Sequence, residues 1–341
     1  MVEFSKDLNF KKLPSECVWQ IYALLRSVEK FYILLSAIEL KIFDHLKIPK
    51  RADELAEELG FNTRLIRKLC DTLVVSGFLL KYGDKYQLTE VARMYLTKDS
   101  PYYQGDFIMF FKKSRLQRLC KLTEALKCNY QTENIFIPYR EYIFAMAEVA
   151  IIWDLPRTLE VLRKEQKFMN ARKILDLGGG HGLYAVAFAQ LNPHSEICVI
   201  DLPHVIENIT KDIINKYNYK DRIKLISADF MKHDIGSNYD VVFASNILYM
   251  PKDKLKFILS KINASLKEGG ILISKHWHID DIKKDGTAVL FDLVLSLDGV
   301  DRVFSTNEFC KLLEQCEYSV ISVYDIGNYF SPSKIIIAEK N

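Results

Sequence analysis

The chain has 341 residues, of which 49% are hydrophobic and 27% charged, a balance typical of soluble globular proteins large enough for two domains. Its 47 basic and 44 acidic residues give a net charge of +3, which argues against a nucleic-acid partner. Seven scattered cysteines without a Cys-x-x-Cys pair argue against a disulfide framework or zinc ribbon. The first twelve residues lack the apolar core of a signal peptide, and no run of 18 apolar residues follows. We therefore expect a cytoplasmic protein without a membrane span.

The first hundred residues predict helices followed by a small hairpin. The expected elements are helices over residues 28–46, 51–59 and 63–76 and strands over residues 78–80 and 86–88. This order predicts a winged helix, which binds DNA in some proteins and joins two copies of a chain in others. Because the chain has little excess positive charge, we favour a dimerisation domain at residues 1–100 over a transcription factor.

Residues 101–165 predict a helical segment rich in aromatic side chains, broken at Pro138 and Pro156. Most of these rings belong in a core, but aromatic side chains also dominate the walls of ligand pockets. We therefore interpret the segment as a lid or linker that contributes to an acceptor pocket.

Strands and helices alternate over residues 166–341. The expected strands cover residues 173–177, 196–200, 223–227, 240–244, 270–274, 319–324 and 334–338. Several are short, continuous apolar runs, as a parallel sheet covered on both faces requires. The pattern predicts a doubly wound α/β fold with a seven-stranded, Rossmann-like sheet.

A glycine-rich loop, Asp176-Leu-Gly-Gly-Gly-His-Gly182, follows the first of these strands and opens a helix. Glycines allow a tight turn and a close approach of a ligand to the backbone, and a helix N-terminus offers free N–H groups. Asp201 ends the second strand, where a carboxylate can accept hydrogen bonds from ribose hydroxyls. Asp229 and Phe230 follow the third strand, where they can contact an adenine ring. Three such features at successive strand ends predict a nucleotide-type cofactor site.

At these residues the chain resembles class I S-adenosylmethionine-dependent methyltransferases, and more narrowly the homodimeric small-molecule O-methyltransferases, which include caffeic acid and hydroxyindole O-methyltransferases. The motifs that carry the resemblance are Leu175–Gly182, Val199–Pro203, Ser227–Phe230, Ser245–Leu248 and Leu266–Gly270. The resemblance implies a homodimer, S-adenosylmethionine as methyl donor and S-adenosylhomocysteine as product. It also implies these cofactor contacts: Asp176, Gly178, Gly180, Asp201, Leu202, Asp229, Phe230 and Ser245.

The chain departs from this family where the catalytic base is expected. Family members usually carry a histidine after the fourth strand, as general base for the acceptor hydroxyl, and this chain has Tyr249. The bacteriochlorophyllide C-20 methyltransferase also looks to have Ile-Leu-Tyr at this point. By the same resemblance, His276 and Asp301 occupy the positions of groups that flank the base. Tyr249, His276 and Asp301 are therefore the catalytic candidates.

Several chemistries remain open at this stage, because a tyrosine with an ordinary pKa near 10 is a poor base. The acceptor is a hydroxyl and His276 the base, or it is a carbon of a tetrapyrrole-like ring, or it is sulfur, which needs little or no base. A catalytically silent regulatory protein that still binds the cofactor is the alternative from another class.

His276 and His278 form a His-x-His pattern that in other contexts binds a metal. Because no third ligand has recognisable spacing, we expect no metal here. On a strand the two histidines would share one face and Trp277 the other. The residues expected to line the acceptor pocket are Tyr142, Met146, Trp153, Asn246, Trp277, His278 and Phe291.

Overall fold

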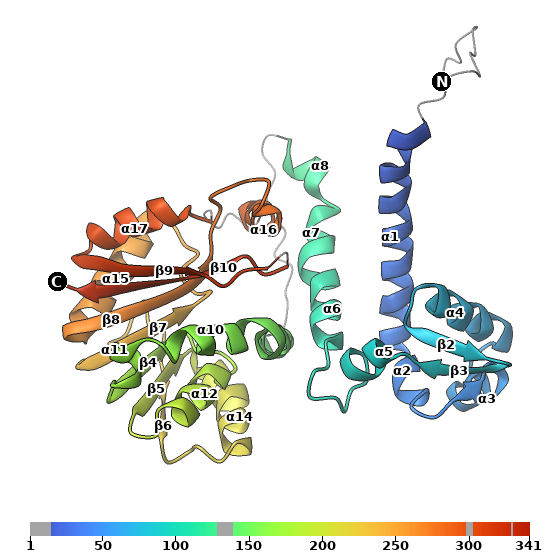
Figure 1. Ribbon diagram of the computed structural model, residues 1–341, viewed down its shortest axis with the longest axis horizontal. Coiled ribbons are helices and arrows are strands. Elements are labelled where there is room, and N and C mark those ends of the chain that lie inside the picture. The colour runs from blue at the N-terminus through green and yellow to red at the C-terminus, as the bar shows by residue number, and fades with distance from the viewer. Residues whose placement is uncertain (1–14, 128–138, 298–302, 329) are drawn as a thin grey trace, which may run out of the picture. The chain divides into compact units, whose positions relative to one another are not determined.

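The computed structural model describes residues 15–127, 139–297, 303–328 and 330–341 (Figure 1). The chain forms two compact units, residues 1–105 and 106–341. Residues 106–165 of the predicted lid segment therefore belong to the same unit as the α/β region. Among the described residues, no helix is both long enough and apolar enough to cross a membrane.

The first unit combines helices with a small antiparallel sheet of order β1-β3-β2. Its elements are α1 (Ser15–Glu39), α2 (Ile42–His45), β1 (Lys50–Arg51), α3 (Ala52–Leu59), α4 (Thr63–Val75), β2 (Leu79–Tyr82), β3 (Lys85–Leu88) and α5 (Glu90–Tyr95). The Asn62 side chain caps α4 by accepting from the backbone N–H of Leu65, and the Thr89 side chain caps α5 in the same way. The helices predicted over residues 51–59 and 63–76 and the hairpin are confirmed, and β1 is an additional short strand.

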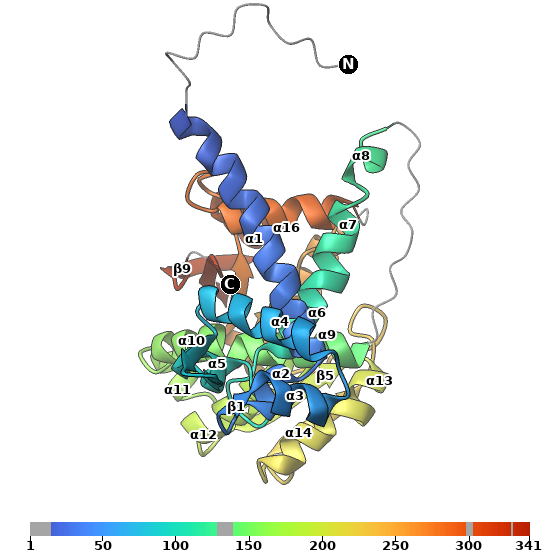
Figure 2. The same cartoon turned by 90° about the vertical axis from the view of Figure 1, so that its right-hand side faces the viewer.

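The single helix predicted over residues 28–46 is wrong, because the chain breaks between α1 and α2. Lys41 adopts a left-handed backbone conformation with φ of 54° and ends the first helix. The break leaves Ile42, Phe43 and Leu46 buried in the core of the unit. Helix α1 also begins at Ser15, well before the predicted start, and Figure 2 shows it extending far beyond α2 and α3.

The second unit contains the predicted seven-stranded sheet, with strand order β6-β5-β4-β7-β8-β10-β9. Strands β6, β5, β4, β7 and β8 are parallel, and β10 runs antiparallel to both of its neighbours. The strands are β4 (Lys173–Leu177), β5 (Glu196–Asp201), β6 (Ile223–Ser227), β7 (Tyr239–Ser245), β8 (Leu266–Trp277), β9 (Tyr318–Asp325) and β10 (Ser333–Lys340). All seven predicted strands are confirmed, and β8 is longer than predicted at both ends.

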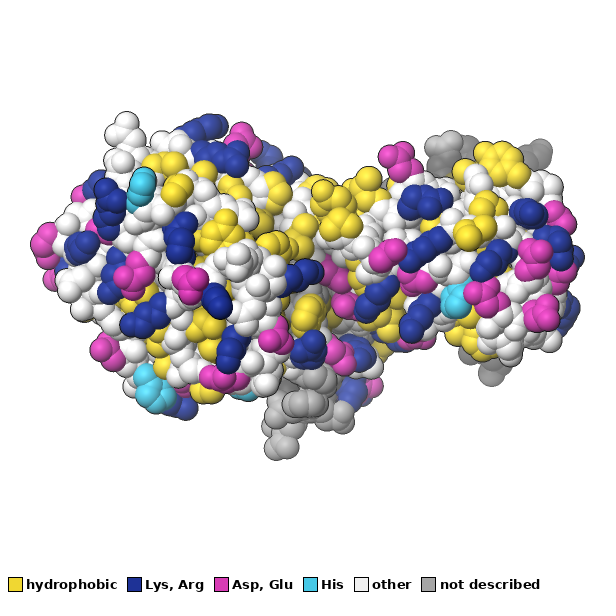
Figure 3. Space-filling view, turned by 90° about the horizontal axis from the view of Figure 1, so that it is seen from below, with side chains coloured by type: hydrophobic (Ala, Val, Ile, Leu, Met, Phe, Trp, Pro, Cys, Tyr) yellow, Lys and Arg dark blue, Asp and Glu magenta, His cyan; other side chains and the backbone are white. Residues whose placement is uncertain are grey.

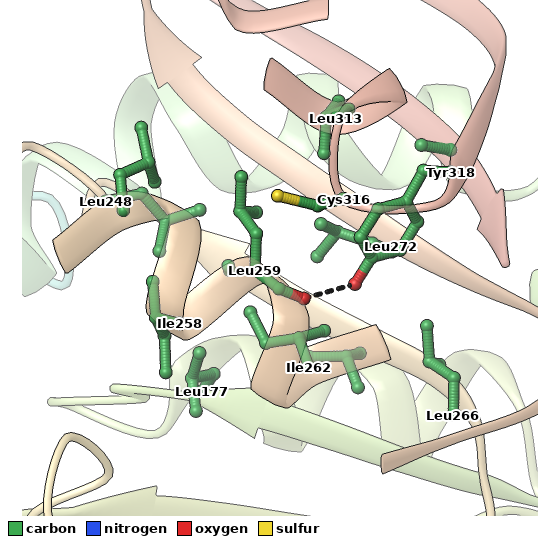
Figure 4. Close-up of a cluster of buried hydrophobic side chains, with 14 of the residues drawn as sticks. Leu177, Leu248, Ile258, Leu259, Ile262, Leu266, Leu272, Leu313, Cys316 and Tyr318 are labelled. Carbon is green, nitrogen blue, oxygen red and sulfur yellow. Dashed lines mark hydrogen bonds between the residues drawn. The ribbon is translucent and has the colours of Figure 1, made fainter. Parts of the chain in front are cut away.

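Helices cover both faces of this sheet (Figure 1). One core layer packs the sheet against α15 (Lys252–Ser265) and α17 (Thr306–Glu314), and Figure 4 shows Tyr318 donating a 2.9 Å hydrogen bond to the carbonyl of Leu259 within it. The other layer packs it against α10 to α12 and the helical stretch that ends in α14. The helices of that side are α10 (Leu155–Leu162), α11 (Gln166–Met169), α12 (Leu183–Leu191), α13 (Pro203–Val205), η3 (Ile206–Thr210) and α14 (Lys211–Lys216).

The helical segment before the sheet contains two π-helical turns. Its elements are α6 (Gly105–Phe111), η1 (Lys112–Leu116), α7 (Gln117–Leu119), α8 (Leu122–Ala125), α9 (Tyr139–Val149) and η2 (Ala150–Asp154), and α16 (Gly286–Leu297) follows later in the chain. The prediction that Pro156 breaks the segment is wrong, because α9, η2 and α10 are continuous. The π-turn η2 precedes Pro156, which lies in the first turn of α10, where its missing N–H is tolerated. Pro138 lies outside the described residues.

A buried ion pair connects this helical segment to the sheet. Lys275 on β8 is fully buried and donates to the carboxylate of Asp154 on η2. The other oxygen of Asp154 accepts a 2.8 Å hydrogen bond from Ser331, which follows β9. Three distant parts of the chain therefore meet at one buried carboxylate.

We expect Lys275→Met to destabilise the protein by about 3–5 kcal/mol, because the substitution leaves the Asp154 carboxylate buried without its cation. Urea unfolding followed by circular dichroism measures the change. The double variant Lys275→Met/Asp154→Leu should recover most of the loss. As a control, Lys167→Met removes the partly exposed pair with Glu339 and should cost at most about 1 kcal/mol. Equal losses in the two single variants would contradict this interpretation.

Candidate cofactor and acceptor site

The glycine loop after β4 is bound to the end of β5. The backbone N–H of Gly178 donates to the carbonyl of Ile200 at 2.8 Å. Gly178 has φ of 68°, and a Cβ atom there would lie 2.7 Å from Cγ1 of Ile247, so both backbone conformation and space require glycine. The loop lies at the carboxyl end of the sheet, where α/β folds bind nucleotides.

Asp201 organises the neighbouring strand ends. Its Oδ2 accepts from the backbone N–H of Gly180 at 2.8 Å, and its Oδ1 accepts from Leu202 at 2.7 Å. The N–H of Ala228 donates to the Asp201 carbonyl at 2.9 Å, which brings in the loop after β6. Burial raises the pKa of this carboxyl, while the two backbone N–H groups oppose that shift. The predicted contacts Gly178, Gly180, Asp201 and Leu202 therefore lie together.

Asp229 and Phe230 lie in the loop that this carbonyl holds. Asp229 is half-buried, and the hydrogen bond from the N–H of Met231, at 2.9 Å, lowers the pKa of its carboxyl. Phe230 is half-buried against the core layer of α15, and Lys261 donates to its carbonyl at 2.8 Å. Ser245 ends β7 directly opposite Lys275 of β8. These residues occupy the strand ends expected from the sequence.

The carboxyl group of Asp176 has an oxygen atom without a hydrogen-bond partner in the described part of the chain. Its Oδ2 is buried without a hydrogen-bond partner among the described residues. Burial, and secondly the charge of Asp201, raise the pKa of its carboxyl to about 8. A buried carboxylate of this kind is stabilised by a cation. S-adenosylmethionine carries both a sulfonium and an ammonium group, so the residues fit this cofactor.

His276 is held on both sides of its ring. Its Nε2 accepts from the backbone N–H groups of Ile247 and Leu248 at 3.1 and 3.0 Å. The proton therefore resides on Nδ1, which donates to Ser274 Oγ at 2.8 Å. Burial is the main cause that lowers the pKa of His276 well below its usual value. The ring is neutral and its free electron pair is already occupied, which argues against a role as general base.

Tyr249 occupies the loop that His276 holds. Its hydroxyl accepts from the backbone N–H of Trp277 at 2.7 Å and donates to Asn246 Oδ1 at 3.1 Å. Burial raises the pKa of Tyr249 above its ordinary value, so the phenol stays protonated at neutral pH. Asp301, the third catalytic candidate, lies outside the described residues. Neither of the two described candidates is therefore a ready base.

Aromatic rings surround the Tyr249 side chain. Phe291 on α16 lies edge-on to Tyr249, with ring centroids 5.3 Å apart, and edge-on to Trp277 at 5.0 Å. The predicted pocket residues Asn246, Trp277 and Phe291 are thus brought together with Tyr249. We call Tyr249, Trp277 and Phe291 the ring cluster.

The other predicted pocket residues have further contacts within the unit. His278 packs with His276 against Phe309 of α17, and its Nδ1 lies 3.2 Å from the carbonyl of Phe304. Among the described residues no group of three metal-binding side chains includes this His-x-His pair. Tyr142 on α9 packs against Phe110 of α6, with centroids 5.5 Å apart. Met146 on α9 is half-buried, and Trp153 on η2 is exposed.

Arg115 on η1 is a member of this neighbourhood that the sequence reading missed. Its guanidinium lies 5.5 Å from the ring centroid of Phe111, 5.8 Å from Trp277 and 5.3 Å from Phe291. The available signal was the spacing of four between Phe111 and Arg115, which places the two side chains on one face of a helix. The buried pair of Lys275 with Asp154 left no such signal.

Known families account for most of this chain. Residues 140–319 match the O-methyltransferase domain family, and residues 23–98 match the O-methyltransferase dimerisation domain. The chain belongs to the O-methyltransferase family. It is an S-adenosylmethionine-dependent methyltransferase, and the resemblance seen in the sequence is confirmed.

Three relatives illustrate the range of the family. An uncharacterized protein of Methanocaldococcus jannaschii is 36% identical over 87% of this chain and 83% of its own length. The 3-hydroxy-5-methyl-1-naphthoate 3-O-methyltransferase of Streptomyces sahachiroi is 27% identical over 74% of this chain and 75% of its own. The bacteriochlorophyllide d C-20 methyltransferase of Chlorobaculum tepidum is 24% identical over 92% of this chain and 91% of its own.

The fold is shared with solved structures of low sequence identity. Human N-acetylserotonin methyltransferase, solved in complex with S-adenosylmethionine, has a TM-score of 0.80 with 20% identity. The match covers 98% of this chain and 99% of the human one.

We expect binding of S-adenosylmethionine to release about one proton at pH 7, because Asp176 is protonated in the free protein and a bound cation favours its ionised form. Affinity should therefore rise with pH from 6 to 8 and level off above the free-state pKa. Calorimetry in two buffers of different ionisation enthalpy measures the released proton.

The matched control is Asp176→Asn, which should bind the cofactor with little proton release. Equal proton release by wild type and variant would show that another group titrates.

Proposed function

We propose that this enzyme transfers the methyl group of S-adenosylmethionine to a small, largely apolar or aromatic acceptor whose reacting atom is nucleophilic without a base from the protein. The observation that carries the proposal is the engagement of both described candidates: His276 Nε2 accepts two backbone N–H groups, and the Tyr249 hydroxyl is a neutral donor. An acidic hydroxyl, which is ionised near neutral pH, is the acceptor atom that best combines this site with the family.

The chain supplies position rather than proton transfer in this mechanism. When bound, S-adenosylmethionine provides an electrophilic methyl group on a sulfonium. The ring cluster holds a flat acceptor and excludes water, and the hydrogen bonds of the Tyr249 hydroxyl to Trp277 and Asn246 hold its ring in place. Proximity and orientation are worth roughly 7–11 kcal/mol, whereas one general base contributes about 10²–10⁴-fold in rate. An acceptor that ionises by itself makes that base unnecessary.

Methylation of an electron-rich carbon is the second candidate. It is supported by Tyr249 itself, since a phenol that stays protonated and donates to Asn246 takes no proton from the acceptor. Bacteriochlorophyllide d C-20 methyltransferase, a relative over nearly the whole chain, acts on carbon. Methylation of sulfur also needs no base, but no particular contact favours it. The family assignment favours an enzyme over the silent cofactor-binding alternative.

We further propose that the enzyme acts as a homodimer in the cytoplasm. The apolar side chains Ile21, Leu24, Leu25 and Val28 are exposed at helical spacing on α1. Such a stripe is typical of a helix that packs against another chain. Five cysteines, Cys70, Cys120, Cys198, Cys310 and Cys316, are free, which is typical of a reducing compartment.

Nucleic acid is not among the partners we propose. On the face drawn in Figure 3, basic and acidic side chains are interspersed over both units. Binding to the phosphates of nucleic acid without regard to sequence instead needs basic side chains clustered in one area of the surface.

We expect the pH dependence of methyl transfer to follow the pKa of the acceptor. With a series of substituted 2-naphthols, the rate at which S-adenosylhomocysteine forms should level off at lower pH for the more acidic members. Tyr249→Phe should lose only several-fold in rate, because it removes the hydrogen bonds to Asn246 and Trp277 that hold the ring, and not a base. A single pH profile shared by all acceptors would instead reveal a base on the protein and contradict the proposal.

We expect Leu24→Asp/Val28→Asp to convert a dimer into monomers, because two charges would be buried in the interface. Light scattering coupled to size exclusion measures the mass. Lys30→Asp changes an exposed charge on the same helix and should leave the dimer intact. A monomeric wild type at micromolar concentration would refute dimerisation.

A further inference from the structure

Arg115 carries a positive charge for which the described part of the chain provides no counter-charge. The guanidinium lies over the rings of Phe111, Trp277 and Phe291, and it has no hydrogen bond or ion pair with a described residue. Its surroundings lower the pKa of Arg115, and burial is the sole cause. Arginine nevertheless stays protonated in proteins, so the charge is present and only partly compensated by the ring faces.

Arg115 also differs from the charged residues beside it. Lys113, on the same π-turn, is exposed and forms a 2.7 Å ion pair with Glu141. The sheet buries Lys275 and provides Asp154 for it. Arg115 alone among these three lacks a carboxylate in the described structure. A partly buried cation without an anion is costly, and a bound anion would offset that cost.

A second unsatisfied donor belongs to the same group of rings. The indole Nε1 of Trp277 is buried without a hydrogen-bond acceptor among the described residues. Buried tryptophan N–H groups usually have a partner. The ring that carries this N–H is one of the three rings around the Arg115 guanidinium. Two donors that need an oxygen acceptor therefore occur within one aromatic neighbourhood.

We propose that Arg115 binds a carboxylate group of the methyl acceptor, with the indole N–H of Trp277 as an additional donor. The planar fork of a guanidinium matches the two oxygens of a carboxylate, and the aromatic rings suit the flat body of the same molecule. Phe291 contacts both Arg115 and Tyr249. One aromatic acceptor can therefore have its carboxylate at Arg115 and its reacting atom toward Tyr249. The acceptor class is thus an aromatic carboxylic acid. This inference rests on the proposed methyltransferase function.

Binding of a matched pair of probes tests the inference. The protein is first saturated with S-adenosylhomocysteine, and the dissociation constants of 6-hydroxy-2-naphthoate and 2-naphthol are measured by calorimetry. The two probes differ only in the carboxylate. Wild type should bind the naphthoate at least about tenfold more tightly than the naphthol, as expected for a charge-assisted hydrogen bond. Arg115→Met should abolish this preference, and Arg115→Lys should restore part of it.

The control variant is Lys113→Met, which removes a nearby exposed charge and should keep the preference. Three results would overturn the inference: equal affinity of wild type for both probes, a preference that survives Arg115→Met, or tighter binding of 2-naphthyl phosphate than of the naphthoate.

Cofactor binding is measured first in every sample. If S-adenosylhomocysteine does not bind, the proposed methyltransferase function fails. If it binds and the carboxylate makes no difference, only the role of Arg115 fails.

Discussion

Two neighbouring backbone N–H groups, those of Ile247 and Leu248, donate to one nitrogen atom of His276, and both halves of the site depend on this contact. It holds the loop after β7 against the end of β8. On one side of that loop, Ile247 packs against Gly178 of the glycine loop, so closely that no larger residue fits at position 178. On the other side, the loop presents Tyr249 to Trp277 and Phe291. The ring that the sequence suggested as a base thus has a structural task that uses the same electron pair.

The sequence predicted best those parts of the fold that depend on residue type at a given position along the chain. The strands β4 to β8 are short apolar runs, and the glycine loop with Asp201 lies at strand ends, so order along the chain sufficed to place them. The sequence did not predict where helices end or continue, because local backbone geometry determines this. Lys41 ends α1 through a left-handed conformation, and the π-turn before Pro156 keeps the helix continuous. Neither departure has a signature in hydrophobic periodicity.

Contacts between distant residues were equally invisible in the sequence. Asp154 and Lys275 are 121 positions apart, and each reads as an ordinary surface charge in its own segment. The role of His276 depends on which groups its two nitrogens meet, and residue type cannot reveal that. Arg115 lay in a segment that the aromatic residues identified as a pocket wall, but the pattern drew attention to the rings and not to the cation between them.

The second unit buries three ionisable side chains, Asp176, Lys275 and Arg115, fully or in part. They differ in whether the fold supplies a partner of opposite charge. Lys275 has its carboxylate within the fold, so its charge serves stability. Asp176 has an unpartnered oxygen and a raised pKa, and Arg115 has a guanidinium over aromatic rings without an anion in the described chain. Asp176 is protonated at pH 7 in the free protein and Arg115 stays charged, so a cation at the first and an anion at the second would each offset the cost of a buried charge. A cationic methyl donor suits the first, and the anionic aromatic acceptor that we propose suits the second. In the proposed function no base is needed, because an acceptor that is held by its carboxylate and ionised at its own hydroxyl has only to be positioned at the methyl group.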